Sequence, residues 1–148
     1  MADQPLYLEL TESDEKLVRI DFRRGIMPPP GPSPSSLMRN TALELHAYFD
    51  GRLREFSIPL KAEGTDFQMS VWEALQEIPY GETLSYKEVA EQIGKPKAAR
   101  AIGGAVGKNP IPIIIPCHRV LAAGGKLGGF AGGTDIKKWL LAIEGIWR

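Results

Sequence analysis

The sequence has few of the residues that build disulfides and metal sites. Its 148 residues include one cysteine, Cys117, and two histidines, His46 and His118. One cysteine cannot form an internal disulfide, and this set is too small for a structural zinc site, so we expect no metal. Most lone cysteines are small buried hydrophobic residues, so the neighbours of Cys117 must decide whether it has a chemical role.

Long hydrophobic runs and a strong net charge are also missing. No apolar run approaches the roughly 20 residues that cross a bilayer, and the N-terminal MADQPLYLEL has no basic segment followed by an apolar one. We therefore expect an intracellular protein with no membrane partner. The formal net charge is zero, with −2 over residues 1–64 and +2 over residues 65–148. Phosphate attraction alone would then not give tight nucleic-acid binding.

Composition and patterning divide the chain near residue 62. The elements expected before it are strands at 6–10 and 17–23 around a turn at 11–15, a Pro/Ser loop at 28–36, a helix at 37–49 and a third strand at 56–60. This pattern predicts a small α+β lobe over residues 1–62. Nothing in it suggests chemistry, and we expect His46 to be a surface or packing residue.

Helical patterns dominate residues 63–148, the second predicted domain. The expected helices are one capped by Thr65 with Gln68 and running to Ile78, one capped by Ser85 with Glu88 and running to Ile93, one over 97–106, and a last one capped by Thr134. The second and third helices, joined by a turn at 94–96, form a helix-turn-helix pattern. Residues 122–129 (AAGGKLGG) resemble a hairpin tip, or wing, and residues 111–115 a buried strand or extended segment.

The stretch NPIPIIIPCHRV, residues 109–120, is the most informative for chemistry. A cysteine becomes a useful nucleophile when a nearby cation or base stabilises its thiolate. Adjacent residues of a regular strand point to opposite faces, so Cys117 and His118 interact only if the chain turns at Pro116 or a water bridges them. His118 also needs an orienting partner, for which Glu144 of the last helix is the candidate. The alternative is an inert core cysteine beside a surface histidine.

PCHRV, residues 116–120, resembles the active-site motif of the O6-alkylguanine-DNA alkyltransferases, also called methylated-DNA–protein-cysteine methyltransferases. The similarity continues in order through FQMSVWEALQEIPYGETLSYKEVA, KAARAIGGAVGKNPIPIIIPCHRV, GGFAGG and KKWLLAIEG. It covers essentially all of residues 65–148, with a weaker match before them. The resemblance implies a ribonuclease-H-like N-terminal lobe and a helical C-terminal lobe with a winged helix-turn-helix.

The same resemblance implies DNA repair by direct reversal of damage. The alkyl group of O6-alkylguanine, and of O4-alkylthymine, in duplex DNA would pass to Cys117 in a single turnover, after the nucleotide has been flipped out of the helix. No cofactor is implied. We expect a monomer in solution that binds the DNA minor groove, with cooperative binding on DNA left open. The location would be the cytoplasm, or the nucleoid if the organism is bacterial.

Roles at matching positions also follow from the resemblance. Cys117 would accept the alkyl group, His118 would deprotonate it through a water, Glu144 would orient His118, and Asn109 would fix the active-site loop. Tyr86 would rotate a DNA phosphate and donate a hydrogen bond to the leaving guanine. The residues that shape the pocket would be Pro112, Val120, Phe130 and Ala131. The DNA contacts would be Lys97, Ala99, Arg100, Ala101, Gly103, Gly104 and Arg119, with Arg100 filling the space of the flipped base.

Two positions depart from the family pattern, since Phe130 stands where tyrosine is common and Ala131 where serine is common. The loss of two hydroxyl groups would change which alkyl groups fit and would leave the transfer chemistry intact. Each assigned role also has a plainer alternative: a solvated surface side chain for Arg100, helix packing for Tyr86, and a surface charge for Glu144.

Two other functions remain open. One is a non-catalytic sensor of alkylated DNA, but such proteins lack the acceptor cysteine that this chain has at Cys117. The other is a winged-helix transcription regulator with an inert cysteine. Its weakness is that the candidate recognition helix carries Ala and Gly where base-reading Arg, Asn or Gln is expected.

Overall fold

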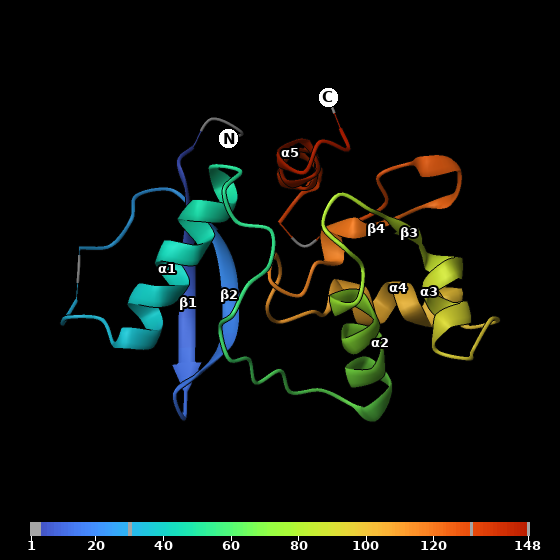
Figure 1. Ribbon diagram of the computed structural model, residues 1–148, viewed down its shortest axis with the longest axis horizontal. Helices are drawn as coiled ribbons and strands as arrows, with labels where there is room; N and C mark the ends of the chain where they lie inside the picture. Colours follow the sequence, from blue (N-terminus) through green and yellow to red (C-terminus); the bar gives the residue numbers. More distant parts are fainter. Residues whose placement is uncertain (1–3, 30, 131, 148) are drawn as a thin grey trace.

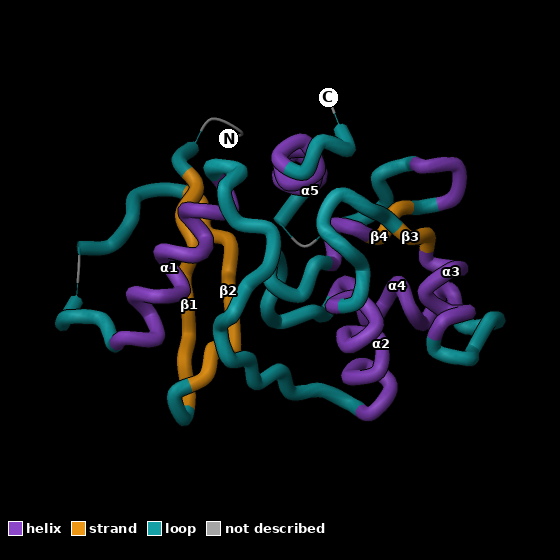
Figure 2. Tube along the Cα trace, viewed as in Figure 1, coloured by secondary structure: helices purple, strands orange, loops and turns teal. Residues whose placement is uncertain are grey.

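The structure, a computed structural model, describes residues 4–29, 31–130 and 132–147 and has a mixed α/β fold (Figures 1 and 2). Its elements in chain order are β1 (Leu6–Ser13), β2 (Lys16–Arg24), α1 (Ser36–Phe49), α2 (Asp66–Gln76), β3 (Leu84–Ser85), α3 (Tyr86–Gln92), α4 (Ala99–Gly107), the 3-10 helix η1 (Cys117–Arg119), β4 (Val120–Leu121), the 3-10 helix η2 (Ala123–Gly125) and α5 (Thr134–Ile143). None of the described helices is long and apolar enough to cross a membrane.

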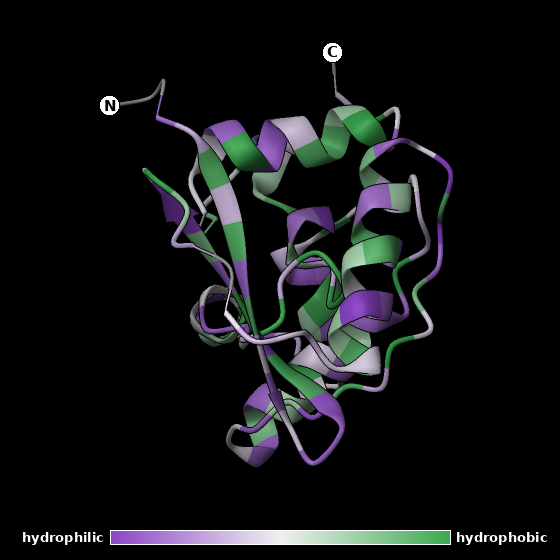
Figure 3. Ribbon diagram, turned by 90° about the vertical axis from the view of Figure 1, so that its left-hand side faces the viewer, coloured by the Kyte–Doolittle hydropathy of each residue, from purple (hydrophilic) through white to green (hydrophobic). Residues whose placement is uncertain are grey.

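The first strands form an antiparallel hairpin that is longer than predicted. Pairing runs from Leu6 with Arg24 to Ser13 with Lys16. The turn is therefore only Asp14 and Glu15, whose φ angles of 53° and 61° suit the tight turns that follow the twist of a hairpin. The hydropathy colouring of Figure 3 alternates along these strands, as expected for a sheet with one buried face.

The helix predicted over 37–49 is confirmed as α1. It begins one residue earlier than predicted, at Ser36, after the N-cap Ser35. The third strand predicted at 56–60 is wrong. Only Leu60 forms a bridge to β2, at Leu17. The Leu17 amide donates to the carbonyl of Pro59, and Pro59 has no N–H with which to continue a ladder.

Both predicted capping boxes are confirmed. The Thr65 hydroxyl accepts from the Gln68 amide at the start of α2, and Ser85 with Glu88 does the same for α3. The α2 helix ends at Gln76, and its apolar stripe is buried at Val71, Trp72, Leu75 and Ile78. These local signals therefore located two helix starts correctly.

The turn between α3 and α4 is longer than predicted. Gly94 has a φ of +76°, and the Lys95 amide donates to the Ala90 carbonyl, which is the closing bond of a Schellman motif. The Ala98 amide then donates to the Lys95 carbonyl, so Lys97 and Ala98 belong to the turn. The α4 helix begins at Ala99, two residues after the expected start.

Three expectations for the C-terminal half are wrong. Residues 111–115 form buried turns, neither strand nor extended, and the Ile115 amide donates to the Ile111 carbonyl over 2.9 Å. Residues 122–129 were expected to be the tip of a hairpin, but they form no strand pair of their own in the described part of the chain. The strand just before them, β4, pairs instead with β3, in parallel. Thr134 is not a cap but the first residue of α5. The cap is Gly133, whose φ of +101° sets the direction of the chain.

Two hydrophobic clusters join the two halves of the chain. One packs Leu17 and Ile20 of β2 against α2 and α4, and the other packs Leu45 and Tyr48 of α1 against Ile136, Leu140 and their neighbours. Figure 1 shows α5 between the hairpin with α1 on one side and α2 to α4 on the other. The predicted lobes therefore share their cores.

We expect opposite stability effects from alanine at two glycines. A Cβ on Gly64 would lie 2.6 Å from the ring of Trp72, which is buried, whereas a Cβ on Gly104 within α4 meets nothing within 4 Å. Gly64→Ala should lower the free energy of unfolding by about 1–3 kcal/mol through overpacking. Gly104→Ala should raise it by about 0.5–1 kcal/mol through helix propensity. Urea unfolding of both variants checks this, and equal stability for Gly64→Ala would contradict it.

Candidate active site

A tight turn at Pro116 sets the geometry of the predicted motif. Pro116 has φ −79° and ψ 67°, and the Cys117 amide donates to the Ile115 carbonyl over 2.7 Å, which is an inverse γ-turn. Cys117 and His118 then follow each other in η1. The chain therefore turns at Pro116, which is one of the two arrangements left open by the sequence. Successive residues of a 3-10 helix point about 120° apart, so the two side chains enter different surroundings.

Asn109 ties together the loop that precedes this turn. Its side-chain amide donates to the Ile115 carbonyl over 2.8 Å, and its oxygen accepts from the Ile111 amide over 3.0 Å. Between them Ile113 has a φ of +75°, where a β-branched side chain is strained by roughly 1–3 kcal/mol. The loop is thus held in a conformation that its own sequence does not favour.

His118 and Glu144 form the pair that the sequence suggested. His118 Nε2 lies 2.6 Å from Glu144 Oε2, and both side chains are fully buried. Arg119 donates to both carboxylate oxygens, over 2.9 and 3.1 Å, and the Gly81 amide donates to Oε1 over 2.9 Å. Burial opposes ionisation of Glu144, but the hydrogen bonds from His118 and Arg119 outweigh it and lower its pKa to about 2.

The ionised carboxylate determines the protonation of the imidazole. A carboxylate only accepts hydrogen bonds, so Nε2 of His118 must carry the proton and Nδ1 is left as the acceptor. Nδ1 is buried and has no hydrogen-bond partner among the described residues. Burial lowers the pKa of His118, against the opposing effect of Glu144. At neutral pH the ring is therefore a neutral base with one free nitrogen.

Cys117 borders a small cavity of about 190 Å³. The lining residues are Tyr86, Gly103, Val106, Gly107, Cys117, Gly129 and Phe130. Cavities of roughly 150 Å³ hold a benzene, so a flat ring can enter this one and lie against the thiol. Burial raises the pKa of Cys117 to about 11, while a hydrogen bond from Asn109 and the charge of Lys137 lower it. The thiol is thus protonated at neutral pH and needs a base.

Sequence reasoning missed Lys137. This side chain is fully buried in α5, and its ammonium donates to the carbonyls of Val120 over 2.7 Å and Gly129 over 3.2 Å. Burial lowers the pKa of Lys137 to about 8, and the neighbouring Cys117 opposes this. The available signal was its position four residues before the buried Leu141, on the apolar side of the helix.

Tyr48 was missed as well. Nothing in the sequence of the first lobe suggested chemistry, yet the Tyr48 hydroxyl of α1 donates to Glu144 Oε2 over 2.5 Å and lies 3.3 Å from His118 Nε2. No local pattern distinguishes Tyr48 from the other apolar-stripe residues of its helix. Only the packing of α1 against α5 reveals this contact.

The α4 helix presents a face of small residues to solvent. Lys97, Arg100, Ala101 and Gly104 are exposed, and Ala99 and Gly103 are half-buried, while Ile102, Ala105 and Val106 face the core. The exposed residues recur at helical spacing, so they form one stripe with Arg100 as its long cation. Six of the seven expected DNA contacts thus lie on or beside α4.

Arg119 does not fit its expected role as a DNA contact. Its guanidinium is buried, and it donates to Glu144 and to the Ile78 carbonyl over 2.6 Å. A side chain held in this way cannot reach a phosphate, and it serves the carboxylate. Pro112 is buried beside Asn109 and residues of β2, in a different cavity from that of Cys117. Val120 is buried directly after η1, and Ala131 lies outside the described residues.

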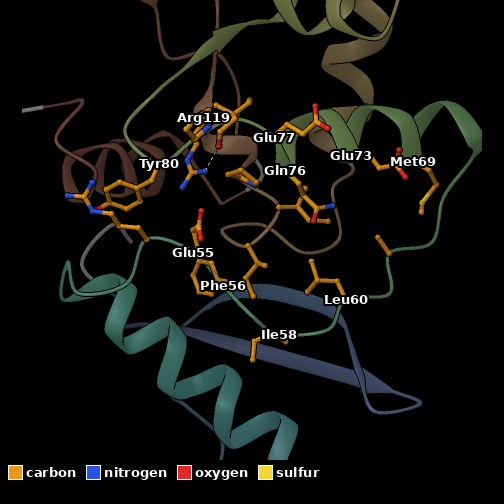
Figure 4. A pocket seen from close by; sticks show the side chains of 17 residues that line it. Glu55, Phe56, Ile58, Leu60, Met69, Glu73, Gln76, Glu77, Tyr80 and Arg119 are labelled. Atoms are coloured by element: carbon orange, nitrogen blue, oxygen red, sulfur yellow. Dashed lines mark hydrogen bonds between the residues drawn. The ribbon is translucent and has the colours of Figure 1, made fainter.

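A larger cavity, of about 690 Å³, lies away from the thiol (Figure 4). It runs between residues 54–62 and α2, with Tyr80 and Arg119 toward one end and Leu60 and Met69 toward the other. Cys117 is not among its lining residues, so it does not serve the thiol. Among the described residues no three His, Cys, Asp or Glu side chains are grouped as metal ligands.

Comparison with known proteins agrees with this arrangement. A family model described as 6-O-methylguanine DNA methyltransferase, DNA binding domain, matches residues 66–146. A methylated-DNA–protein-cysteine methyltransferase of Methanosarcina barkeri is 50% identical, over 97% of this chain and 94% of the relative. One of Mycolicibacterium paratuberculosis is 61% identical, over 68% of this chain and 61% of the relative.

The fold is also similar to that of a solved structure. The crystal structure of Mycobacterium tuberculosis OGT in complex with DNA superposes with a TM-score of 0.80 at 46% identity, over 93% of this chain and 85% of that chain. The family model covers more than half of the sequence, and the similarity to the M. barkeri relative extends over nearly all of it. The chain therefore belongs to the 6-O-methylguanine DNA methyltransferase family.

Proposed function

We propose that this protein repairs DNA by moving the alkyl group of O6-alkylguanine in duplex DNA onto Cys117. It is a methylated-DNA–protein-cysteine S-methyltransferase, and each molecule acts once because the thioether has no evident route of regeneration. The observation that carries the proposal is a thiol at the wall of a ring-sized cavity, in a chain of this family, next to a buried histidine–carboxylate pair. O4-alkylthymine is a second substrate of the same chemistry.

The proton and the electron pair have defined routes. The thiol proton of Cys117 passes through a water to Nδ1 of His118, the nitrogen left free by Glu144. The sulfur then attacks the alkyl carbon, so that an S–C bond forms as the O6–C bond breaks and the electron pair leaves with guanine. The guanine takes up one proton to become neutral, and the imidazolium releases one to solvent.

Two groups stabilise the thiolate while it forms. Lys137 supplies a buried positive charge, and Asn109 supplies a hydrogen bond; both lower the pKa of Cys117 against the effect of burial. Glu144 gains an attraction to His118 only once the ring is charged. These interactions are strongest when the proton has moved, which is the condition for accelerating the reaction.

We assign the remaining cavity residues to substrate recognition. The hydroxyl of Tyr86, at the first turn of α3, would donate to the leaving guanine and displace a DNA phosphate, and Phe130 would pack on the base. Val120 would present its backbone to the guanine edge. Ala131 and Pro112 stay as weaker candidates, the first outside the described residues and the second beside Asn109 in another cavity.

DNA would approach the small-residue face of α4. Side chains no larger than a methyl group let a helix enter the narrow minor groove, and Arg100 would occupy the space of the extruded nucleotide. We describe α3 and α4 as a helix-turn-helix in residues 63–148, with the loop after β4 in the place of a wing but, among the described residues, without its strand pair. The first lobe, residues 1–62, would be a reduced ribonuclease-H-like unit. We expect a monomer, with cooperativity on DNA left open, beside the genome in the cytoplasm or nucleoid.

The alternatives are weaker. A damage sensor without catalysis needs no thiol, whereas Cys117 is present and its neighbour His118 is poised to accept a proton. A sequence-reading regulator needs base-reading side chains on its recognition helix, and the exposed stripe of α4 offers Ala, Gly and Arg100.

Replacing the acceptor tests the function directly. The wild-type protein, incubated with duplex DNA containing one O6-methylguanine, should gain the mass of one methylene unit on the Cys117 peptide. Cys117→Ala should gain none and should still bind the damaged duplex, because the cavity keeps its shape. Intact-protein mass spectrometry and peptide mapping check both. Transfer to Cys117→Ala, or an unmodified wild-type protein, would contradict the assignment.

Arg100→Ala tests the extrusion of the nucleotide. Filling the gap in the duplex offsets part of a flipping cost of a few kcal/mol, so the variant should react at least about 10-fold more slowly with damaged duplex. Its reaction with the free base O6-benzylguanine, which needs no flipping, should keep the wild-type rate. Lys108→Ala, beyond the end of α4, is the control for lost positive charge. Equal losses on both substrates would argue against this role for Arg100.

The single-turnover rate should depend on pH in two directions. The rate should fall on the acid side of the ordinary histidine pKa of 6.5, because His118 becomes protonated there and burial holds its pKa below that value. Above about pH 8 the rate should fall again, because Lys137 loses the charge that stabilises the thiolate. Lys137→Met should be roughly 10-fold slower at neutral pH and lack the alkaline decline. A wild-type rate that keeps rising to about pH 10 would exclude the role of Lys137.

A further inference from the structure

Tyr48 brings the first lobe into the buried network around Glu144. The residue belongs to α1, is fully buried, and packs its ring against Phe56 at 5.5 Å and Tyr80 at 6.1 Å between centroids. Its hydroxyl donates to Glu144 Oε2 over 2.5 Å, and 96 residues separate the two partners in the chain. The carboxylate that orients His118 is therefore held from the opposite half of the molecule.

Glu144 Oε2 is the point at which several donors meet. It accepts from Tyr48, from His118 over 2.6 Å and from Arg119 over 3.1 Å, while Oε1 accepts from Arg119 and the Gly81 amide. A carboxylate offers about four lone-pair positions, so five donors more than fill it. Tyr48 and His118 therefore donate to the same oxygen, and each hydrogen bond weakens the other.

We propose that Tyr48 is a positioning residue for alkyl transfer, supplied by the first lobe, which fixes Glu144 and thereby limits how strongly the carboxylate holds the protonated ring of His118. This inference rests on the proposed function. A donor on Oε2 fixes the carboxylate in the plane that suits His118. It also withdraws charge from that oxygen, so the imidazolium is bound less tightly and returns its proton more readily.

Packing alone does not explain why residue 48 carries a hydroxyl group. A phenylalanine would fill the same space, since the ring of Tyr48 is surrounded by apolar neighbours. A buried hydroxyl without a partner would cost stability, and its partner in the structure is the catalytic network. Burial, and next the charge of Glu144, raise the pKa of Tyr48 far above its ordinary value, so the hydroxyl keeps its proton at every working pH.

The charged and titratable groups around His118 are few. Glu144, which follows α5, and Tyr48 of α1 contact its Nε2 side, and Arg119 and Lys137 both disfavour its protonated form. Cys117 precedes it in η1, and Tyr80 lies against Tyr48 and under the guanidinium groups of Arg54 and Arg119. Of the two tyrosines in this group, only Tyr48 has its hydroxyl on Glu144 and beside His118, so Tyr48→Phe removes one donor from the carboxylate and leaves every charge in place.

The test compares Tyr48→Phe with Tyr80→Phe in the full-length chain. Both variants lose one phenol hydroxyl from adjacent rings, but the Tyr80 hydroxyl donates to the backbone carbonyl of Ile143 and not to Glu144. Two measurements are made. The first is the titration of His118 by nitrogen NMR with isotopically labelled histidine, in which the exposed His46 is the internal reference. The second is the single-turnover rate with O6-methylguanine duplex as a function of pH.

We expect the His118 titration of Tyr48→Phe to move to higher pH by roughly half a unit to one unit, which corresponds to the net free energy of one typical hydrogen bond. The acidic limb of the rate profile should move with it, which is a loss of about 3- to 10-fold on the acid side of that limb. His46 should not move in either variant, and Tyr80→Phe should keep both wild-type curves.

Each outcome has one meaning. Unchanged curves for Tyr48→Phe with a normal wild-type rate would overturn the inference and leave the proposed function intact. A wild-type protein that transfers no alkyl group would overturn the proposed function, while the NMR titration would still report on the link between Tyr48 and His118. Equal shifts in both variants would show a packing effect and overturn the inference.

A second variant covers the case in which Tyr48→Phe does not fold. Site-specific 3-fluorotyrosine at position 48 keeps the ring and the hydroxyl and makes the hydroxyl a stronger donor. The His118 titration and the acidic limb should then move to lower pH, the opposite direction from Tyr48→Phe. A shift to higher pH, or none, would overturn the proposed role.

Discussion

The arrangement of this protein depends on one buried carboxylate. The Glu144 side chain has no exposed surface, and a buried charge is tolerated only when it is paired and hydrogen-bonded. Its donors come from distant parts of the chain, namely α1, the loop at Gly81 and η1. Satisfying the carboxylate therefore fixes the relative positions of these segments. The same contacts leave Nδ1 of His118 without a hydrogen-bond partner among the described residues, as the proposed role of this nitrogen as a base requires.

The tight loop before η1 is a second constraint, because it sends two residues that are adjacent in sequence, Cys117 and His118, into different surroundings. The γ-turn at Pro116 and the left-handed Ile113 direct Cys117 to the cavity beside α4 and His118 to the polar network beside α5. Asn109 holds both ends of the loop. The backbone strain at Ile113 is compatible with stability because its side chain is buried in the second hydrophobic cluster.

The two halves of the chain are not independent bodies. Each hydrophobic cluster contains residues from both, and the Phe22 and Phe130 rings lie 5.7 Å apart across the boundary. The loop that carries Phe130 borders the cavity of Cys117, so the hairpin also supports a wall of the site. The first lobe thus contacts both the cavity wall at Phe130 and the network around Glu144, the second through the hydroxyl of Tyr48.

Local signals in the sequence determined several helix boundaries and the position of the candidate acceptor cysteine. The capping boxes at Thr65 and Ser85, the apolar stripe of α2 and the PCHRV motif depend on residues close in the chain, so they could be interpreted without a structure. The long-range features could not. The burial of Arg119, the ammonium of Lys137 near the thiol, the contact of Tyr48 with Glu144 and the failure of residues 56–60 to form a strand all depend on which segments meet in space. Such contacts arise from packing between distant elements, and spacing along the chain gives at most the buried side of a helix, as for Lys137, and not the groups that meet there.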